Sequence, residues 1–406
     1  MGLAENLNTA RLALHGGPAV RATLLPYGRH DIDEDDITAV SDALRSDRLT
    51  SGPLVSEFEG ALARVAGTDH AVAVSSGTAA LHAAMFAVGV GSGDEVIVPP
   101  ITFAASANAA VYQGGTPVFA DVNPDTLLLD PAQVAAKITS RTRAIVAVDY
   151  AGQPCDYNTL GRVVRDTGRT IWIVADACHA IGARDNGRPV GSLADLSVFS
   201  LHPVKHVTTG EGGAVTTNDG NIAERIRMFR NHGITVEHRE RIAQVSWMYE
   251  IVELGYNYRL TDIQCALGLS QLSKLPARIG RRQAIAEEYK RAFASIPEVQ
   301  PLEVRPTVSH AYHLFVVRID TKGLSCDRTT VFAALRHEGI GVNVHYIPVH
   351  YHPFYRKRFG TGPGLCPIAE AAYEQILTLP LFPTMSARDV QDVIASVTKV
   401  VEAYRR

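Results

Sequence analysis

The sequence predicts an α/β fold in which a mostly parallel sheet forms a large domain and a smaller α+β domain follows. Short runs rich in Val and Ile alternate with helical stretches from residue 70 onward, which is typical of a parallel sheet covered by helices on both faces. After about residue 275 the pattern changes to a long polar helix and then a mixed region. We therefore expect an N-terminal arm (1–30), a large domain (31–275) and a small domain (276–406).

The arm contains several glycines and prolines and no regular pattern. The acidic run Asp31 to Asp36 precedes apolar residues at helical spacing, so we interpret it as the charged first turn of a helix rather than as a metal site. In the large domain the predicted strands are 70–74, 95–98, 117–120, 144–148, 171–175 and 196–199, with a helix over 79–88 and a hairpin over 210–217 at the edge of the sheet.

In the small domain the pattern predicts a helix over 278–293, a strand over 313–319 and a helix over 328–338. A terminal helix carries an apolar stripe for packing, made of Val390, Val393, Ile394, Val397 and Val401.

Composition excludes several classes of protein. The 39 Lys and Arg residues against 42 Asp and Glu residues give a net charge of -3, which argues against nucleic-acid binding. The sequence has no apolar run long enough to span a bilayer and no signal-peptide pattern at its start. The five cysteines are scattered without a C-x-x-C spacing, so we expect a reduced, cytoplasmic protein without a structural zinc site.

One pair of residues carries most of the chemistry. Asp176 ends a predicted strand, and Lys205 follows on a loop after the next strand. Ligands of α/β folds bind at the carboxyl ends of the strands, where a partly desolvated lysine has a lowered pKa and can attack a carbonyl. Pyridoxal phosphate enzymes need such a pair: the lysine bonds the cofactor, and the carboxylate keeps its ring nitrogen protonated.

Three further elements fit the same cofactor. Ser76 to Ala79 lies at a strand-to-helix junction, where free backbone N–H groups can bind a phosphate. Ser200 can add a hydroxyl, and Phe103 follows another strand and can stack on the ring. Each element taken singly has an ordinary structural explanation, and their combination and order favour the cofactor.

With these motifs the chain resembles the DegT/DnrJ/EryC1/StrS sugar aminotransferases, which have the seven-stranded fold type I of pyridoxal 5'-phosphate enzymes. The resemblance runs from Asp31 to the last helix and is carried by the phrases Ser76-Gly77-Thr78-Ala79-Ala80-Leu81, Gly91-Ser92-Gly93-Asp94-Glu95-Val96, Gly255-Tyr256-Asn257-Tyr258-Arg259 and Thr261-Asp262-Ile263-Gln264. Two stretches, His202-Pro203-Val204-Lys205 and Val344-His345-Tyr346-Ile347-Pro348-Val349-His350, are similar to the UDP-4-amino-4,6-dideoxy-N-acetyl-β-L-altrosamine transaminases of pseudaminic acid synthesis.

The resemblance implies a role for each site residue. Lys205 and Asp176 are the catalytic pair, and the other cofactor-binding residues are Thr78, Ala79, Phe103, His179, Ser200 and Asn257. Asn257 matches a residue that reaches the phosphate from the neighbouring subunit, which implies a homodimer. The substrate-binding candidates are His202, His232, Arg259, His345, Tyr346 and His350. The alternative for Arg259 is an internal partner, and the alternative for the 345–350 histidines is a structural role; we expect no metal there.

The implied reaction moves an amino group, with glutamate as the expected donor, to the 4-keto carbon of a UDP-linked 6-deoxy hexose. Other nucleotide-linked 4-keto sugars, such as a UDP-4-keto-pentose or a dTDP-4-keto-6-deoxy sugar, stay open as substrates. A pyridoxal phosphate-dependent dehydratase is a further alternative, although family members of that kind carry histidine in place of the lysine. The last alternative is a regulatory protein that has this fold but catalyses no reaction.

Overall fold

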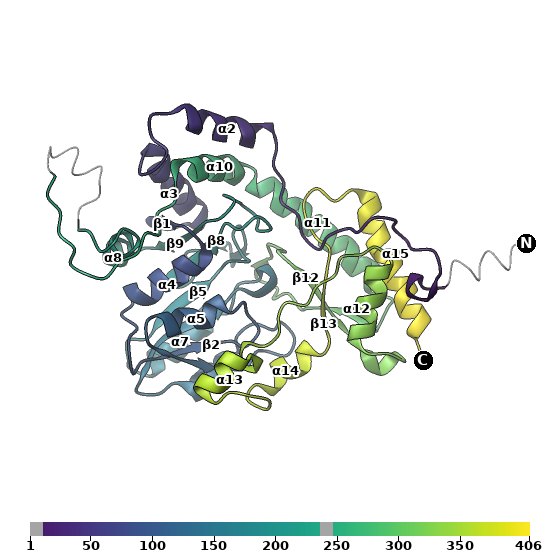
Figure 1. Cartoon of the computed structure of the whole chain (residues 1–406). Helices are drawn as coiled ribbons and strands as arrows, with labels where there is room; N and C mark the ends of the chain where they lie inside the picture. The colour runs from purple at the N-terminus through teal and green to yellow at the C-terminus, as the bar shows by residue number, and fades with distance from the viewer. Residues whose placement is uncertain (1–10, 236–246) are drawn as a thin grey trace, which may run out of the picture.

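The computed structural model describes residues 11–235 and 247–406, so residues 1–10 of the predicted arm lie outside the described residues (Figure 1). The helices are η1 (Ala13–His15), α2 (Glu34–Arg45), α3 (Pro53–Ala66), α4 (Gly77–Ala87), α5 (Ala105–Tyr112), α6 (Pro131–Lys137), η2 (Tyr150–Gly152), α7 (Tyr157–Asp166), α8 (Gly220–Arg230), α10 (Asp262–Ser273), α11 (Leu275–Phe293), η3 (Thr321–Gly323), α12 (Arg328–His337), η4 (Val349–Tyr351), α13 (Pro353–Phe359), α14 (Pro367–Tyr373) and α15 (Ala387–Tyr404). The strands are β1 (His70–Val74), β2 (Glu95–Val98), β3 (Thr116–Phe119), β4 (Thr142–Val148), β5 (Trp172–Asp176), β6 (Arg184–Asp185), β7 (Arg188–Pro189), β8 (Leu196–Ser200), β9 (Gly213–Thr217), β10 (Val299–Pro301), β11 (Val308–Ser309), β12 (Phe315–Ile319) and β13 (Ile376–Leu379).

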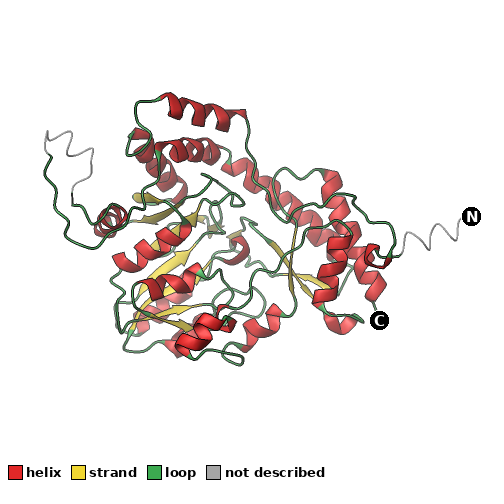
Figure 2. Cartoon of the chain, in the orientation of Figure 1, coloured by secondary structure: helices red, strands yellow, loops and turns green. Residues whose placement is uncertain are grey.

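A seven-stranded sheet in the order β1-β9-β8-β5-β4-β2-β3 organises the larger lobe. Neighbours from β8 to β3 are parallel, and β9 is antiparallel to both β8 and β1. All residues of β2 and β9 are buried although successive side chains point to opposite faces, so both faces of the sheet are covered. Figure 2 shows the helices around these strands. The predicted sheet is therefore confirmed.

The predicted hairpin over 210–217 needs a correction. The strand β9 does pair with β8 as a hairpin, but it is not at the edge of the sheet, because β1 pairs with its other side. Sequence pattern could not show this, since the pairing joins Val74 to Gly213 across a long stretch of chain.

The apolar core divides into two clusters. The first surrounds the seven-stranded sheet and also takes in Val349, Tyr355 and Ile376 of the C-terminal region. The second lies among α11, α12, α15 and the antiparallel sheet β10-β12-β13. Residues 11–27, which we call the N-terminal strap, run along this second cluster and bury Leu12 and Leu25 in it. No helix in either described range combines the length and apolar character needed to cross a membrane.

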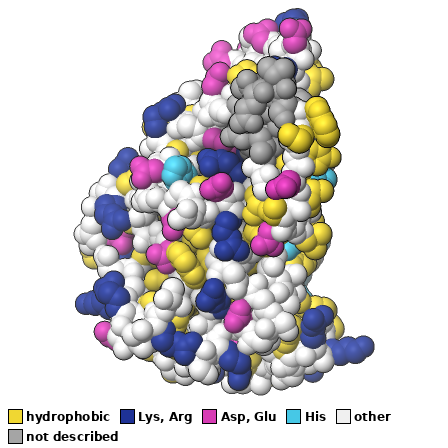
Figure 3. Space-filling view, turned by 90° about the vertical axis from the view of Figure 1, so that its left-hand side faces the viewer, with side chains coloured by type: hydrophobic (Ala, Val, Ile, Leu, Met, Phe, Trp, Pro, Cys, Tyr) yellow, Lys and Arg dark blue, Asp and Glu magenta, His cyan; other side chains and the backbone are white. Residues whose placement is uncertain are grey.

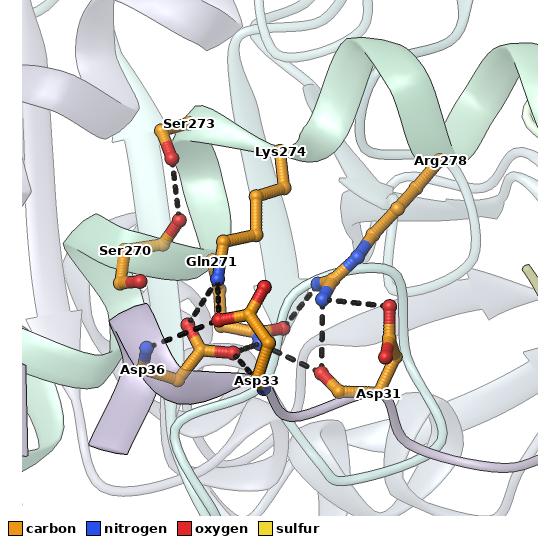
Figure 4. Close-up of polar contacts among 8 residues, drawn as sticks. All are labelled: Asp31, Asp33, Asp36, Ser270, Gln271, Ser273, Lys274 and Arg278. Carbon is orange, nitrogen blue, oxygen red and sulfur yellow. Dashed lines mark hydrogen bonds and ion pairs between the residues drawn. The ribbon is translucent and has the colours of Figure 1, made fainter. Parts of the chain in front are cut away.

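The acidic run before α2 has the structural role that its sequence predicts. Asp33 and Asp36 form a capping box at the start of α2. Lys274, between α10 and α11, forms an ion pair with Asp33 and lies 3.0 Å from Asp36, and Arg278 of α11 lies 3.1 Å from the Asp31 carboxylate (Figure 4). These contacts tie the start of α2 to the junction of α10 and α11.

Candidate active site

A cavity of about 410 Å³ opens at the carboxyl ends of the parallel strands. Such ends are where open α/β sheets bind ligands, because the loops that follow the strands diverge there. The polar and aromatic side chains that line it are Tyr27, Ser76, Thr78, Thr102, Phe103, Asp176, Cys178, His179, Ser200, His202, Lys205, Glu211, His313, His345 and Tyr346. The cavity thus collects residues from the strap, from the large sheet and from the C-terminal region.

Asp176 is the last residue of β5 and is only 6% exposed. The hydroxyl of Ser106 donates to its Oδ2 at 2.6 Å, and the backbone N–H of Cys178 donates to its Oδ1 at 3.3 Å. Thr102 in turn contacts the Ser106 hydroxyl at 2.6 Å. These hydrogen bonds hold the carboxylate in one orientation.

Lys205 lies on the loop that follows β8, where its backbone N–H donates to the carbonyl of His202 at 2.9 Å. Its side chain is half-buried and lines the cavity. Burial lowers the pKa of Lys205, although the nearby Cys178 and Asp176 act in the opposite direction. A lysine with a lowered pKa presents more free amine at neutral pH, which is the form that attacks a carbonyl.

The start of α4 is built to receive an anion. Ser76 caps the helix by accepting from the N–H of Ala79, and Thr78 lines the cavity beside Ser200. A Cβ on Gly77 would stand 3.0 Å from the Cβ of Ser200, so a glycine permits this close approach. The positive end of the helix dipole and two hydroxyls therefore face the same space.

Another part of the cavity lining is aromatic. Tyr346 and His179 are joined by a hydrogen bond of 3.1 Å between Oη and Nε2, and Phe103 lies with its ring centre 6.2 Å from that of Tyr346. Burial lowers the pKa of His179 well below its usual value, and the Lys205 charge adds to this. His345, which contacts the Thr378 hydroxyl at 2.9 Å, has its pKa lowered to about 4 by burial. Both rings are therefore neutral at physiological pH.

These residues fit pyridoxal phosphate. The ring nitrogen of this cofactor pairs with a fixed carboxylate such as Asp176, and its aldehyde bonds to a lysine. Its phosphate binds at a helix N-terminus that has hydroxyl groups nearby. The Nδ1 of buried His179 has no hydrogen-bond partner within the described chain, so it is available to a bound molecule. We therefore assign Lys205, Asp176, Thr78, Ser200, His179 and Phe103 to that cofactor as a proposal.

The structure places five of the predicted site residues away from the cavity lining. Ala79 is buried inside the first turn of α4, where its N–H is used by the cap. Asn257 and His232 are exposed, and Asn257 forms a β-bridge with Asn231, the residue before His232. Arg259 donates a hydrogen bond to the side-chain oxygen of Asn231 at 2.7 Å. His350 is fully buried and contacts the Glu370 carboxylate at 3.0 Å, which gives it a structural partner.

Sequence reasoning missed several residues that the fold brings to the site. Tyr27, His313 and Glu211 line the cavity, and Ser106 orients Asp176. Thr102 lies before α5 and Ser106 lies in its first turn, and no local pattern links this pair to Asp176, which is 70 positions further along the chain. No local pattern marks Tyr27 or His313, because each arrives from a segment far away in the chain.

The fold and the cavity together define an α/β transferase of the pyridoxal phosphate type. Comparison with known proteins makes the assignment more specific. The model of the DegT/DnrJ/EryC1/StrS aminotransferase family matches residues 30–398. The chain belongs to this family.

Individual relatives cover nearly the whole chain. The spore coat polysaccharide biosynthesis protein SpsC of Bacillus subtilis is 41% identical over 384 residues, which are 94% of this chain and 98% of that protein. Among solved structures, Helicobacter pylori PseC, an aminotransferase involved in the biosynthesis of pseudaminic acid, has a TM-score of 0.87 at 33% identity, covering 94% of this chain and 100% of that one.

The Streptococcus pneumoniae protein Spr1654 also has a TM-score of 0.87, at 34% identity, covering 93% of this chain and 99% of that one, and has been solved in PLP and PMP forms. These matches confirm the predicted fold, the sugar aminotransferase class, and pyridoxal 5'-phosphate as the cofactor of the family.

Proposed function

We propose that this chain transfers an amino group from glutamate to the 4-keto carbon of a UDP-linked 4-keto-6-deoxy hexose, as in pseudaminic acid biosynthesis. The single observation that carries the transfer is that Lys205 and Asp176 line one cavity beside the N-terminus of α4. The sugar is supported by the likeness of the stretches around Lys205 and 344–350 to the transaminases of that pathway, and by the similarity to PseC.

The chain's own groups account for the steps of an amino transfer. Pyridoxal phosphate, when bound, supplies an aldehyde that exchanges amino groups and a ring that accepts electrons. Asp176, oriented by the hydroxyl of Ser106, would pair with the ring nitrogen. Lys205 Nζ takes a proton from the carbon that bears the amino group and returns it elsewhere, as a general base and then a general acid. Its lowered pKa suits this double role.

We propose that another group of residues lining the cavity recognises the substrate. His345 and Tyr346 line the cavity, together with His202 and the newly found Tyr27, whose ring centre lies 5.1 Å from that of His345. Imidazole nitrogens and phenol hydroxyls can form hydrogen bonds with sugar hydroxyls. We propose these residues for the nucleotide sugar and keep Arg259 and His232 as further substrate-binding candidates.

A homodimer is part of the same proposal. Large apolar side chains between 247 and 256 are solvent-exposed in one chain, among them Trp247 at 84% and Leu254 at 78%. In Figure 3 hydrophobic side chains border the grey segment on this face. Exposed apolar surface of this kind marks an interaction site. Asn257 follows directly and does not line its own cavity, as expected of a residue that completes the site of a second copy.

The test is incubation of purified protein with pyridoxal phosphate, glutamate and a panel of UDP- and dTDP-linked 4-keto sugars, including a 4-keto-pentose. We expect a UDP-4-amino-6-deoxy hexose by mass spectrometry and NMR, with the Lys205→Ala protein as the inactive control. An amino sugar from another member of the panel would replace the proposed substrate. A deoxygenated sugar with free ammonia would indicate a dehydratase, and a cofactor spectrum unchanged by any donor would indicate a non-catalytic protein.

A further inference from the structure

His313 approaches Lys205 from a segment that sequence analysis left without a function. Its Nε2 lies 3.4 Å from Lys205 Nζ, and both side chains line the cavity. The imidazole is only 6% exposed, and its Nδ1 has no hydrogen-bond partner in the described part of the chain. The contact with Lys205 is therefore the one hydrogen bond that the structure gives this ring within the described residues.

The backbone around His313 is fixed by buried contacts. Arg282 of α11, which is almost fully buried, donates to the carbonyls of Tyr312 and His313 at 3.1 and 3.3 Å. On either side, Ala311 N–H donates to Gly152 and Leu314 N–H donates to Ala151. The segment is thus anchored to both lobes, which fixes the position of the backbone from which the His313 side chain projects.

Neighbouring rings restrict the imidazole further. The centre of the His313 ring lies 4.4 Å from that of His179 and 5.5 Å from that of His206. The Nε2 of His206 is itself bonded to the Ala311 carbonyl at 3.0 Å, so His206 packs against His313 without contacting the lysine by a hydrogen bond. Of these rings, His313 is the one placed to contact Lys205.

We propose that His313 is a positioning residue for Lys205: its Nε2 accepts a hydrogen bond from Nζ and directs the rest of the amine toward the cavity. This inference rests on the proposed function in that Lys205 is taken as the reactive lysine. The lysine side chain carries N–H groups both as an amine and as an ammonium, so in either protonation state one N–H group can point at Nε2 of His313. The lone pair with which the free amine takes up a proton then faces away from His313.

The charge state of the histidine agrees with this role. Burial, followed by the Lys205 charge, lowers the pKa of His313 well below its usual value, so the ring is neutral and has an acceptor nitrogen. The other titratable groups that interact with Lys205 are Asp176, Cys178, His179, His206 and His345. None of these groups makes a hydrogen bond with the Lys205 amine in the described part of the chain, so His313 is the residue that contacts it.

The experiment measures the pKa of Lys205 in protein freed of cofactor. Competitive acetylation with acetic anhydride at a series of pH values, read by mass spectrometry, reports the reactivity of Lys205 against the exposed Lys322. Loss of a hydrogen-bond acceptor destabilises the ammonium, so we expect His313→Phe to lower the pKa of Lys205 by about one unit. His313→Gln keeps an acceptor oxygen and should restore the wild-type value.

The matched control is His206→Gln, which alters the same cluster and leaves the Lys205 contact in place; it should not move the pKa of Lys205. An unchanged pKa in His313→Phe would overturn the proposal, and a raised one would show that Nε2 donates instead of accepting. If the His313→Phe protein does not fold, His313→Leu replaces it in the same measurement, with the same expected result. Borohydride trapping of the cofactor in the wild type separates this result from the proposed function, because label on another lysine would refute the latter alone.

Discussion

The N-terminal strap offers a quantitative test of how the second apolar cluster supports the site. Glu338, which follows α12 and is fully buried, accepts from the N–H of Ala13 at 2.8 Å and of Val20 at 3.0 Å. The same carboxylate pairs with Lys399 of α15 at 2.9 Å. The strap then continues to Tyr27, which lines the cavity. One carboxylate therefore holds a segment that delivers a residue to the site.

The perturbation is Glu338→Gln, which keeps the volume and removes the charge. Each of the two backbone hydrogen bonds to this charged acceptor contributes about 1.5 kcal/mol or more, and Lys399, whose side chain is 14% exposed, loses its charged partner as well. The glutamine keeps one acceptor oxygen, but its NH₂ group faces one of the two backbone N–H donors, Ala13 or Val20, and cannot accept from it. We therefore expect the strap to lose about 3 kcal/mol of local stability. That is a roughly 100-fold rise in the opening equilibrium.

Amide hydrogen exchange of peptides covering residues 11–27 measures this opening directly. Global unfolding is less suitable, because the two apolar clusters need not unfold together. Glu298→Gln is the matched control, since it removes the charge of another buried carboxylate, one that pairs with Arg405 and makes no hydrogen bond to the described residues 11–27; strap exchange should stay close to the wild-type rate. Equal exchange in the two variants would refute the reasoning. Because Tyr27 loses its support, Glu338→Gln should also raise KM for the nucleotide sugar more than that for the amino donor.

Three further outcomes are expected. Lys205→Ala should still bind the cofactor, without a covalent bond, and lose turnover by several orders of magnitude; a wild-type rate would end the mechanism. Gly77→Ala should weaken cofactor binding, because its Cβ would press on Ser200 at 3.0 Å; equilibrium dialysis gives the affinity, and an unchanged value would count against the phosphate site. His82 is buried with its pKa lowered to about 4, so below pH 6.5 the unfolded chain binds a proton that the folded chain does not. Stability should fall as the pH drops, by about 2 kcal/mol at pH 5 from this residue. His82→Phe should remove that part of the acid sensitivity in urea titrations, and identical pH profiles would contradict it.

The strand and helix predictions succeeded where the pattern is local. The strands 70–74 and 95–98 were predicted with the bounds that the structure has, because short apolar runs ended by turn residues leave little choice of element. The position of Asp176 at a strand end followed from the same reasoning. The edge position of β9 was wrong, since strand order depends on pairing between distant segments.

The site was predicted unevenly for the same reason. Asp176 and Ser200 are the last residues of two strands of one sheet and Lys205 follows the second of these, so the topology of the sheet brings them together. His350 was placed among the substrate candidates on its motif, whereas the structure buries it against Glu370. The assignment of Asn257 to a neighbouring subunit stays a prediction.

The amino-acid sequence by itself determined the secondary structure, the family and the lysine–carboxylate pair, because these depend on local periodicity and on motifs that are contiguous in the chain. Only the tertiary structure decided that Tyr27 and His313 belong to the cavity and that Ser106 orients Asp176. A buried polar contact requires two groups to meet at about 3 Å, and for residues as far apart in the chain as Ser106 and Asp176 that distance is set by tertiary packing.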